Sequence, residues 1–354
     1  MRLAESQEQR ELRASVRKFL ADKQPLTAVR ELMDTPSGYD PAVWRQACGQ
    51  LGLPAIAIPE EYGGAGFTFV EQAIVLEELG RALYCGPYFA SAVLAANALL
   101  CCAGEQAKQA HLPGIAAGET IATLALGDEE LAAADDAGTW RLTGRRDLVL
   151  DGAVAGLVLV ATDESLFAVA ADAPGMTRIP LATLDQTRRL AAITFTDTPA
   201  TPVGPAAGLA KALDRAAIAL AAEQLGGAQA ALDMAVAYAK TREQFNRPIG
   251  TFQAIKHRCA DLLLEVESTR SAVLYGAWAV TDDSDELPTV APLTKAYASD
   301  TFSHAAAENI QIHGGIGFTW EHDAHLYFKR AHFDQQFLGD PAAHRERLAQ
   351  RIGI

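Results

Sequence analysis

Polar and apolar positions in the first third of the chain recur with the period of a helix. Between residues 5 and 22, charged side chains alternate with an apolar set made of Leu12, Val16, Phe19 and Leu20. This spacing is typical of an amphipathic helix. Further helices are predicted from about residue 70 to 82, from 90 to 102 and onward to 117. Residues 1–118 are therefore predicted to form an N-terminal helical domain, with turns rich in proline and glycine near its start.

From about Thr120 the pattern changes to short apolar runs that are typical of β-strands. Gly, Asp and Pro separate the runs, which begin near residues 140, 147, 157, 165 and 192. Residues 119–203 are predicted to form a β middle domain of the size of a small barrel or sandwich. Within this domain, the acidic segment 128–138 is predicted to be a loop.

Long helical patterns return after Pro205, with helices predicted over about 209–245, 253–280, 288–313 and 341–352. In the second of these, apolar positions follow three-to-four spacing. The stripe consists of Ile255, Cys259, Leu262, Val266, Val273 and Val280. Because short connections join such long helices, residues 204–354 are predicted to form an antiparallel helical bundle. The predicted fold class is mainly α with a β middle domain.

The charge balance narrows the class of partner. Lys and Arg total 30 against 44 Asp and Glu, which gives a net charge of −14. Nucleic acids and anionic membranes are bound by basic surfaces, so no nucleic-acid partner is expected. A small anionic ligand stays possible, because a few local cations suffice to bind one. The longest apolar run, Phe89–Cys102, contains Asn97 and is shorter than the ~20 residues of a membrane span, so no span is expected.

The cysteine pattern and the N-terminus favour a cytoplasmic protein. The five cysteines are an odd number and contain no C-x-x-C pair, so neither a disulfide framework nor a zinc ribbon is expected. The first ten residues are charged and lack the apolar core of a signal peptide. His322 and His325 could share a helical face as a metal pair, but a solvated surface pair is the favoured interpretation because no further ligand has recognisable spacing.

Two stretches have the chemistry of a ligand site. At the predicted helix break after Tyr238, Arg242 and Arg247 flank Phe245, a combination that could grip a phosphate and stack on a ring. The segment Gln311–Phe318 is rich in glycines that let backbone amides approach a ligand closely. The alternatives are an ordinary helix corner with solvated arginines and a helix end followed by a loop. A third stretch, Lys329–Asp340, is predicted to be a helix or turn that leads to a short loop.

Taken together, in this order and spacing, these stretches resemble the acyl-CoA dehydrogenase family of flavoproteins. Pro59–Gly66 and Glu77–Ala82 resemble its N-terminal helical domain, and Trp140–Ala161 resembles part of its β domain. The resemblance implies a helical domain, a small β-barrel and a C-terminal four-helix bundle. It also implies removal of hydrogens from Cα and Cβ of an acyl-CoA thioester, with a carboxylate as the base and FAD as the hydride acceptor.

The resemblance further implies an FAD that is shared across a subunit interface. One subunit holds the pyrophosphate and adenosine end of the FAD seated in the other. Here that half-site corresponds to Arg242, Phe245, Gln311, Gly314 and Gly315, with Gln244 as a further candidate contact. Asn246 stands where a glycine is usual in the family.

Compared with the family pattern, the sequence lacks several side chains that bind the flavin ring, act as the base or recognise coenzyme A. Leu150 stands where the family's β domain offers a hydroxyl to the flavin ring, and the leucine side chain cannot donate a hydrogen bond. The usual catalytic glutamate position is Leu338, and the alternative family position is Ala216. For coenzyme A recognition, the matching arginine position is close to Ala217, with Arg215 as a candidate replacement.

Two carboxylates are candidate substitutes for the missing base. Glu223 follows Ala216 by seven residues, on the same helix face and ~10 Å further along. It could instead be a structural carboxylate paired with a cation. Asp340 precedes Pro341, which is the pattern of a helix N-cap.

The leading hypothesis is one subunit of a heteromeric, two-gene acyl-CoA dehydrogenase acting on a bulky thioester such as a steroid side chain. A second acyl-CoA dehydrogenase-like subunit would supply the catalytic glutamate, so this chain would contribute no catalytic residue. The first alternative is a self-sufficient homomeric enzyme that uses Glu223 or Asp340. The second is a flavin-free structural or regulatory protein on the same scaffold.

Overall fold

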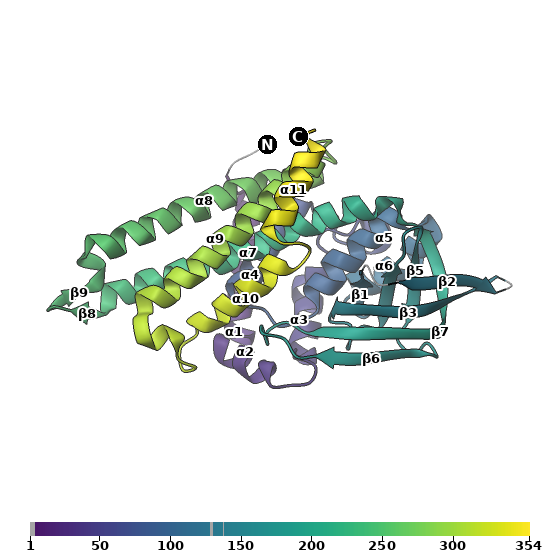
Figure 1. Cartoon of the computed structure of the whole chain (residues 1–354), viewed down its shortest axis with the longest axis horizontal. Coiled ribbons are helices and arrows are strands. Elements are labelled where there is room, and N and C mark those ends of the chain that lie inside the picture. Colours follow the sequence, from purple (N-terminus) through teal and green to yellow (C-terminus); the bar gives the residue numbers. More distant parts are fainter. Residues whose placement is uncertain (1–3, 128–129, 137) are drawn as a thin grey trace. The chain divides into compact units, whose positions relative to one another are not determined.

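The computed structural model describes residues 4–127, 130–136 and 138–354 (Figure 1). The predicted helices of the first third are present. The elements there are α1 (Gln7–Lys23), α2 (Leu26–Met33), α3 (Pro41–Leu51), η1 (Leu53–Ala55), η2 (Glu60–Tyr62), α4 (Phe69–Arg81), the π-helix η3 (Phe89–Ala95), α5 (Ala96–Cys102) and α6 (Glu105–Ala116).

Helix α3 is absent from the sequence prediction, because prolines and glycines mark this stretch as turns. Proline is in fact favoured at the first position of a helix, where its missing N–H leaves no bond unmade. Asp40 caps this helix, and its side chain accepts a hydrogen bond from the backbone N–H of Ala42 at 2.7 Å. The Asp-Pro pair therefore starts a helix here.

The β region contains β1 (Ala122–Ala125), β2 (Leu131–Asp136), β3 (Thr139–Leu150), β4 (Leu157–Ala161), β5 (Ser165–Ala170), β6 (Met176–Leu181) and β7 (Leu190–Pro205). The hydrogen-bonded order is β1-β4-β5-β7-β3-β2, and β6 pairs with β7. Strand β7 joins two ladders, because its first part pairs with β3 and β6 and its last residues pair with β5. The 3₁₀ turn η4 (Ala206–Gly208) follows β7.

The predicted loop at 128–138 is wrong for residues 131–136. Residues 131–136 form β2, which pairs antiparallel with β3. Leu131 and Ala133 pack against the apolar core of the sheet, and the acidic residues at its end are exposed. The charge of the segment marks a solvent-facing edge strand, a common defence against edge-to-edge pairing. Residues 128, 129 and 137 lie outside the described part of the chain.

The C-terminal part is helical, as predicted. It comprises α7 (Leu209–Thr241), the strands β8 (Glu243–Gln244) and β9 (Arg247–Pro248), η5 (Ile249–Thr251), α8 (Gln253–Thr281), α9 (Leu287–His313), η6 (Gly314–Phe318), α10 (Ala324–Gln336) and α11 (Pro341–Arg351). In the stripe on α8, Leu262 and Val266 are fully buried, and Val273 and Val280 are buried. Ile255 and Cys259 are half-buried and pack on an apolar cluster. The stripe therefore faces the interior of the bundle.

The chain divides into two compact units. One consists of residues 1–30, 69–84 and 217–354, and the other of residues 31–68 and 85–216. The three-domain division at 118/119 and 203/204 stays a prediction. Within the described ranges, no helix combines the length and apolar character that a membrane span needs.

Two glycines let helices α4 and α7 touch backbone to backbone. A Cβ on Gly226 of α7 would lie 1.8 Å from the carbonyl oxygen of Glu77 on α4. A Cβ on Gly80 of α4 would lie 1.9 Å from the carbonyl oxygen of Glu223. Neither distance is compatible with a side chain, so the two helices depend on glycine at both positions.

Gly226→Ala is expected to lower the free energy of unfolding by about 1–3 kcal/mol, because the added methyl pushes α7 away from α4. Gly49→Ala in α3 is the matched control, since a Cβ there meets nothing within 4 Å. It should stabilise the protein by about 0.4–1 kcal/mol, because alanine restricts the unfolded chain more than glycine does. Urea unfolding of both variants measures the difference. Equal effects of the two substitutions would show that α4 and α7 tolerate the methyl group.

Candidate functional site

A tight hairpin follows α7. The helix ends at Thr241, earlier than predicted, and β8 and β9 pair through Gln244 and Arg247. The two turn residues, Phe245 and Asn246, have φ of +53° and +60°. A two-residue hairpin with positive φ at both central positions is the favoured type I′ geometry. Asn tolerates this conformation, which explains how Asn246 can replace the glycine that is usual in the family.

The hairpin presents its aromatic and basic side chains to solvent. Phe245 is 86% exposed and lies edge-on to Phe252, with the ring centroids 6.0 Å apart. Arg247 stacks on Phe252 with its guanidinium carbon 4.2 Å from the ring centroid. Arg242 is exposed, and no hydrogen bond or ion pair of its guanidinium is found within the described chain. Its five N–H donors are thus available to a phosphate. Gln244 is also exposed.

The glycine-rich segment forms an open turn at the end of α9. Gly314 has a φ of +63°, which favours glycine, and its N–H closes the helix on the carbonyls of Ile310 and Gln311. Gln311, Gly314 and Gly315 are exposed, and a Cβ at either glycine would meet nothing within 4 Å. The N–H of Gly314 is thus engaged in the helix cap, but the backbone of Gly314 and Gly315 is open to close approach by a ligand.

Side-chain packing joins the glycine turn to the hairpin at one end of the bundle. Tyr238, on the last turn of α7, stacks on His313 at the end of α9 with ring centroids 4.2 Å apart. Ile312 belongs to the same apolar cluster as Ala235 and Ala239, against which Ile249 packs. Figure 1 shows β8 and β9 at the end of α7, where α8 begins. The structure thus brings together the six residues that the resemblance proposed for a flavin half-site: Arg242, Gln244, Phe245, Gln311, Gly314 and Gly315.

His313 is buried directly before the open turn. Its Nδ1 lies 2.7 Å from the carbonyl oxygen of Asn309, so the N–H of this nitrogen donates to that oxygen. Burial lowers the pKa of His313, and the charge of His322 acts in the same direction. A neutral imidazole therefore supports the turn at neutral pH.

Sequence reasoning missed two exposed aromatic residues beside the glycine turn. Phe318 is 85% exposed and Trp320 is 59% exposed. Large apolar side chains gathered on one surface mark sites of interaction. Their position immediately after the glycines was the available signal.

The interpretation of His322 and His325 as a solvated pair is wrong. His325 is buried on α10 and stacks on Trp320, with centroids 4.7 Å apart. His322 precedes α10 and contacts His313. The part of the chain that the structure describes contains no group of His, Cys, Asp or Glu suited to a metal ion. Both histidines therefore act in packing.

Glu223 is held in a buried ion pair. Its Oε1 accepts a hydrogen bond from Arg330 Nη1 at 2.6 Å, and the two side chains are 4% and 1% exposed. The pairing matches the structural alternative that the sequence left open for Glu223. Ala216, one family position of the catalytic base, is buried and carries no ionisable group.

Asp340 caps a helix. Its Oδ1 accepts a hydrogen bond from the N–H of Ala343 at 2.7 Å at the start of α11. Lys295 supports the end of α10 and the loop that follows it. Its Nζ donates hydrogen bonds to the carbonyl of Asp334 at 3.0 Å and to the carbonyl of Gly339 at 3.4 Å. Burial lowers the pKa of Lys295 to about 8. Leu338, the other family position of the base, lies in this loop with a φ of +63°.

The residues at the positions that would contact the isoalloxazine ring of FAD do not suit that role. Leu150 is 1% exposed, and its carbonyl accepts a hydrogen bond from the hydroxyl of Thr123. Leu148 is 62% exposed with a φ of +57°, beside an irregularity in the pairing of β3 with β7. Neither leucine side chain can donate a hydrogen bond to a flavin edge. The nucleotide side, by contrast, has the donors and the open backbone that FAD requires.

Comparison with known proteins agrees with this geometry. Residues 6–119 match the acyl-CoA dehydrogenase N-terminal domain, and residues 208–353 match the acyl-CoA dehydrogenase C-terminal domain. The chain is 41% identical to acyl-CoA dehydrogenase IpdE2 of Mycobacterium tuberculosis, over 98% of each chain.

Two solved structures are also similar. A variant of the steroid ACAD Tcur3481-Tcur3483 is 32% identical, with a TM-score of 0.89 over 98% of each chain. The ChsE4-ChsE5 complex from Mycobacterium tuberculosis is 29% identical, with a TM-score of 0.92 over 100% of this chain and 99% of that one. Two matched domains and a full-length relative of this identity show that the chain belongs to the acyl-CoA dehydrogenase family.

Proposed function

We propose that this chain is one subunit of a heteromeric, FAD-dependent acyl-CoA dehydrogenase. It contributes the nucleotide-holding half of a shared FAD site, and a second acyl-CoA dehydrogenase-like subunit supplies the catalytic glutamate and the ring-binding β domain. One observation carries the proposal. The hairpin and the glycine turn are exposed and offer donors to a nucleotide, whereas the two family positions of the catalytic base hold Leu338 and Ala216. Two similar solved structures bear the names of paired proteins, which supports a paired assembly.

Each residue of the half-site has a role that its chemistry suits. Arg242 holds the pyrophosphate through charge-assisted hydrogen bonds, and Phe245 stacks on the adenine. The amide of Gly315 approaches the phosphates, Gly314 leaves room for them because it has no side chain, and Gln244 and Gln311 contribute side-chain amides. When bound, FAD supplies the acceptor for the β-hydride of the acyl chain. The bulky thioester of a steroid side chain is the proposed substrate, since one similar solved structure is described as a steroid ACAD.

The test is the stoichiometry of flavin per chain. The protein is purified alone and together with a candidate second acyl-CoA dehydrogenase-like chain. We expect colourless protein in the first case and a yellow complex with about one FAD per unlike pair in the second. One FAD per chain in the protein alone would support the homomeric alternative. Colourless protein in both cases would support the flavin-free scaffold.

Arg242→Ala is expected to weaken FAD retention in the assembled complex by about ten- to a hundredfold, because an arginine–phosphate contact is worth ~1.5–3 kcal/mol. The fold should survive, since Arg242 is exposed at a helix end. The control is Arg258→Ala on α8, where the arginine is paired with Glu308 at 2.8 Å. Equilibrium dialysis against FAD measures both variants. Equal FAD affinity in wild type and Arg242→Ala would remove Arg242 from the site.

A further inference from the structure

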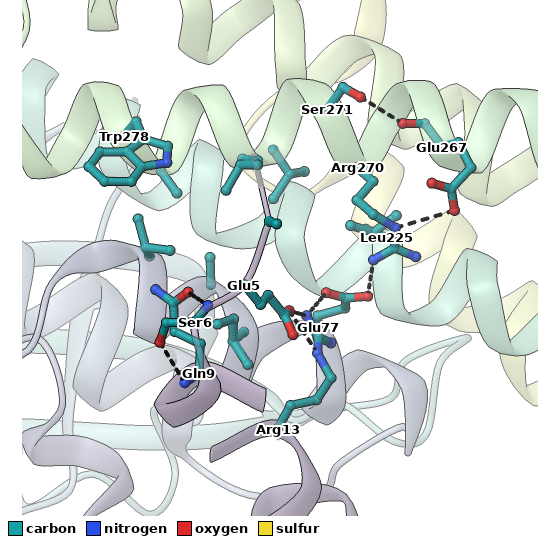
Figure 2. A pocket seen from close by; sticks show the side chains of 17 residues that line it. Glu5, Ser6, Gln9, Arg13, Glu77, Leu225, Glu267, Arg270, Ser271 and Trp278 are labelled. Carbon is teal, nitrogen blue, oxygen red and sulfur yellow. Dashed lines mark hydrogen bonds and ion pairs between the residues drawn. The ribbon is translucent and has the colours of Figure 1, made fainter. Parts of the chain in front are cut away.

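A cavity of about 620 Å³ lies between the start of α1, α4 and the second half of α8 (Figure 2). Pockets that bind small molecules have volumes of about 300–1,000 Å³. The hairpin precedes the first turn of α8, whereas the cavity lies against residues 267–278 of that helix. At ~1.5 Å per residue, the two regions are ~20–35 Å apart along the helix. The cavity is thus no part of the proposed flavin half-site.

Most of the cavity wall is apolar. Its apolar residues include Val70, Ala73, Ile74, Leu225, Leu274 and Ala277. The indole of Trp278 forms part of the same wall (Figure 2). Its Nε1 is hidden from solvent and has no hydrogen-bond acceptor among the described residues. A buried donor without an acceptor is unfavourable, and an oxygen atom of a bound molecule would relieve it after a small shift of the ring.

The remaining wall is charged, but its charges are already paired. Arg13 bridges Glu5 and Glu77, with 2.8 Å between its Nη2 and Glu77 Oε2. Arg270 contacts both Glu77 and Glu267, as the dashed lines in Figure 2 show. Burial acts to lower the pKa of Arg13, but the hydrogen bond to Glu5 and the charge of Glu77 outweigh it, so its pKa is raised. Both arginines are therefore charged and engaged.

This pairing decides the charge of a ligand. An anionic molecule such as a CoA thioester is disfavoured, because the lining carries the three carboxylates of Glu5, Glu77 and Glu267 against the two guanidiniums of Arg13 and Arg270. A cation would lose its hydration in the apolar part of the cavity, which costs free energy. A neutral molecule avoids both of these costs, and its burial against the apolar wall is favourable.

We propose that this cavity binds a neutral, largely apolar lipid that carries a carbonyl oxygen. Its hydrocarbon body packs on the wall formed by α4 and α8, and its oxygen accepts the hydrogen bond of Trp278 Nε1. The inference does not depend on the proposed function, because every lining residue belongs to this chain.

Nile red, a neutral dye with a carbonyl group whose fluorescence rises in apolar surroundings, is a suitable probe. Titration of the whole chain should give saturable binding of one dye per chain, and a neutral lipid ketone should compete with it. The anionic dye anilinonaphthalene sulfonate should not compete. Binding without saturation, or equal competition by the anionic dye, would overturn the proposal.

Two matched substitutions locate the site. Leu274→Trp fills the cavity and should weaken Nile red binding at least tenfold. Leu264→Trp, on the same helix but 70% exposed and outside the lining, should leave binding unchanged. If Leu274→Trp fails to fold, Ser271→Trp repeats the test, because Ser271 lies at the exposed rim. Trp278→Phe keeps an aromatic ring and removes the N–H, and should weaken binding about threefold to tenfold, the effect of one hydrogen bond.

Two further results would count against the site. Equal dye affinity in the Leu274 and Leu264 variants would place the dye elsewhere. Loss of dye binding on assembly with a partner, together with a changed oligomeric state of Leu274→Trp, would show that another subunit covers the cavity.

Discussion

Arg330→Met is expected to lower the free energy of unfolding by about 3–5 kcal/mol, the usual loss when one member of a buried ion pair is removed. Arg330 is 1% exposed in its side chain, and its Nη1 lies 2.6 Å from Glu223 Oε1. Methionine keeps an unbranched apolar stem but has no charge, so the carboxylate of Glu223 stays buried without this cation. A buried charge of this kind is strongly destabilising because the interior solvates it poorly.

A double-mutant cycle checks the reason for this loss. Urea unfolding is measured for Arg330→Met, for Glu223→Gln and for the double variant, which should recover much of the stability. The control is Arg258→Met, which removes an arginine that is 46% exposed in its side chain from a pair with Glu308. Such a partly exposed pair contributes only about 0–1 kcal/mol. If Arg330→Met destabilises no more than Arg258→Met, the pair does not hold Glu223 in place.

Regular patterns made most of the fold predictable. The α8 stripe faces inward because three-to-four spacing leaves one face apolar. The predictions of secondary structure failed where two physical effects oppose each other. The segment 128–138 is acidic in sequence, yet the alternate residues Leu131 and Ala133 of β2 pack on the core. Helix α3 begins with a proline, which breaks a helix anywhere but in its first turn.

The candidate site was predictable in its residue types but not in its geometry. The motif residues could be named from spacing, whereas the early end of α7 could not, because Phe245 adopts a positive φ that its own local preference disfavours. The contact between Tyr238 and His313 joins two distant segments. The partner of Glu223 is Arg330, on a helix far along the chain. Such contacts arise from tertiary packing and leave no local signal.

The chain purified alone is expected to oxidise acyl-CoA thioesters at a rate at least ~10²–10⁴ times lower than the assembled pair, since general-base catalysis contributes about that factor. Leu338 and Ala216 cannot abstract a proton. Glu223 is paired with Arg330, and Asp340 caps α11. Oxidation of a panel of acyl-CoA thioesters, including a steroid side-chain thioester, with an artificial electron acceptor measures the rate in the chain alone and in the pair.

Four substitutions separate a missing base from a missing flavin. Ala216→Glu and Leu338→Glu each place a carboxylate at a family position, and each should stay inactive in the isolated chain, because the ring side of the flavin site is still absent. In the assembled pair, Asp340→Asn should keep full turnover, since asparagine caps a helix as well as aspartate does. Glu223→Gln should lower stability more than turnover per folded molecule. If wild-type protein alone oxidises any acyl-CoA, and Glu223→Gln abolishes that activity without unfolding the chain, then Glu223 is the base and no partner is needed.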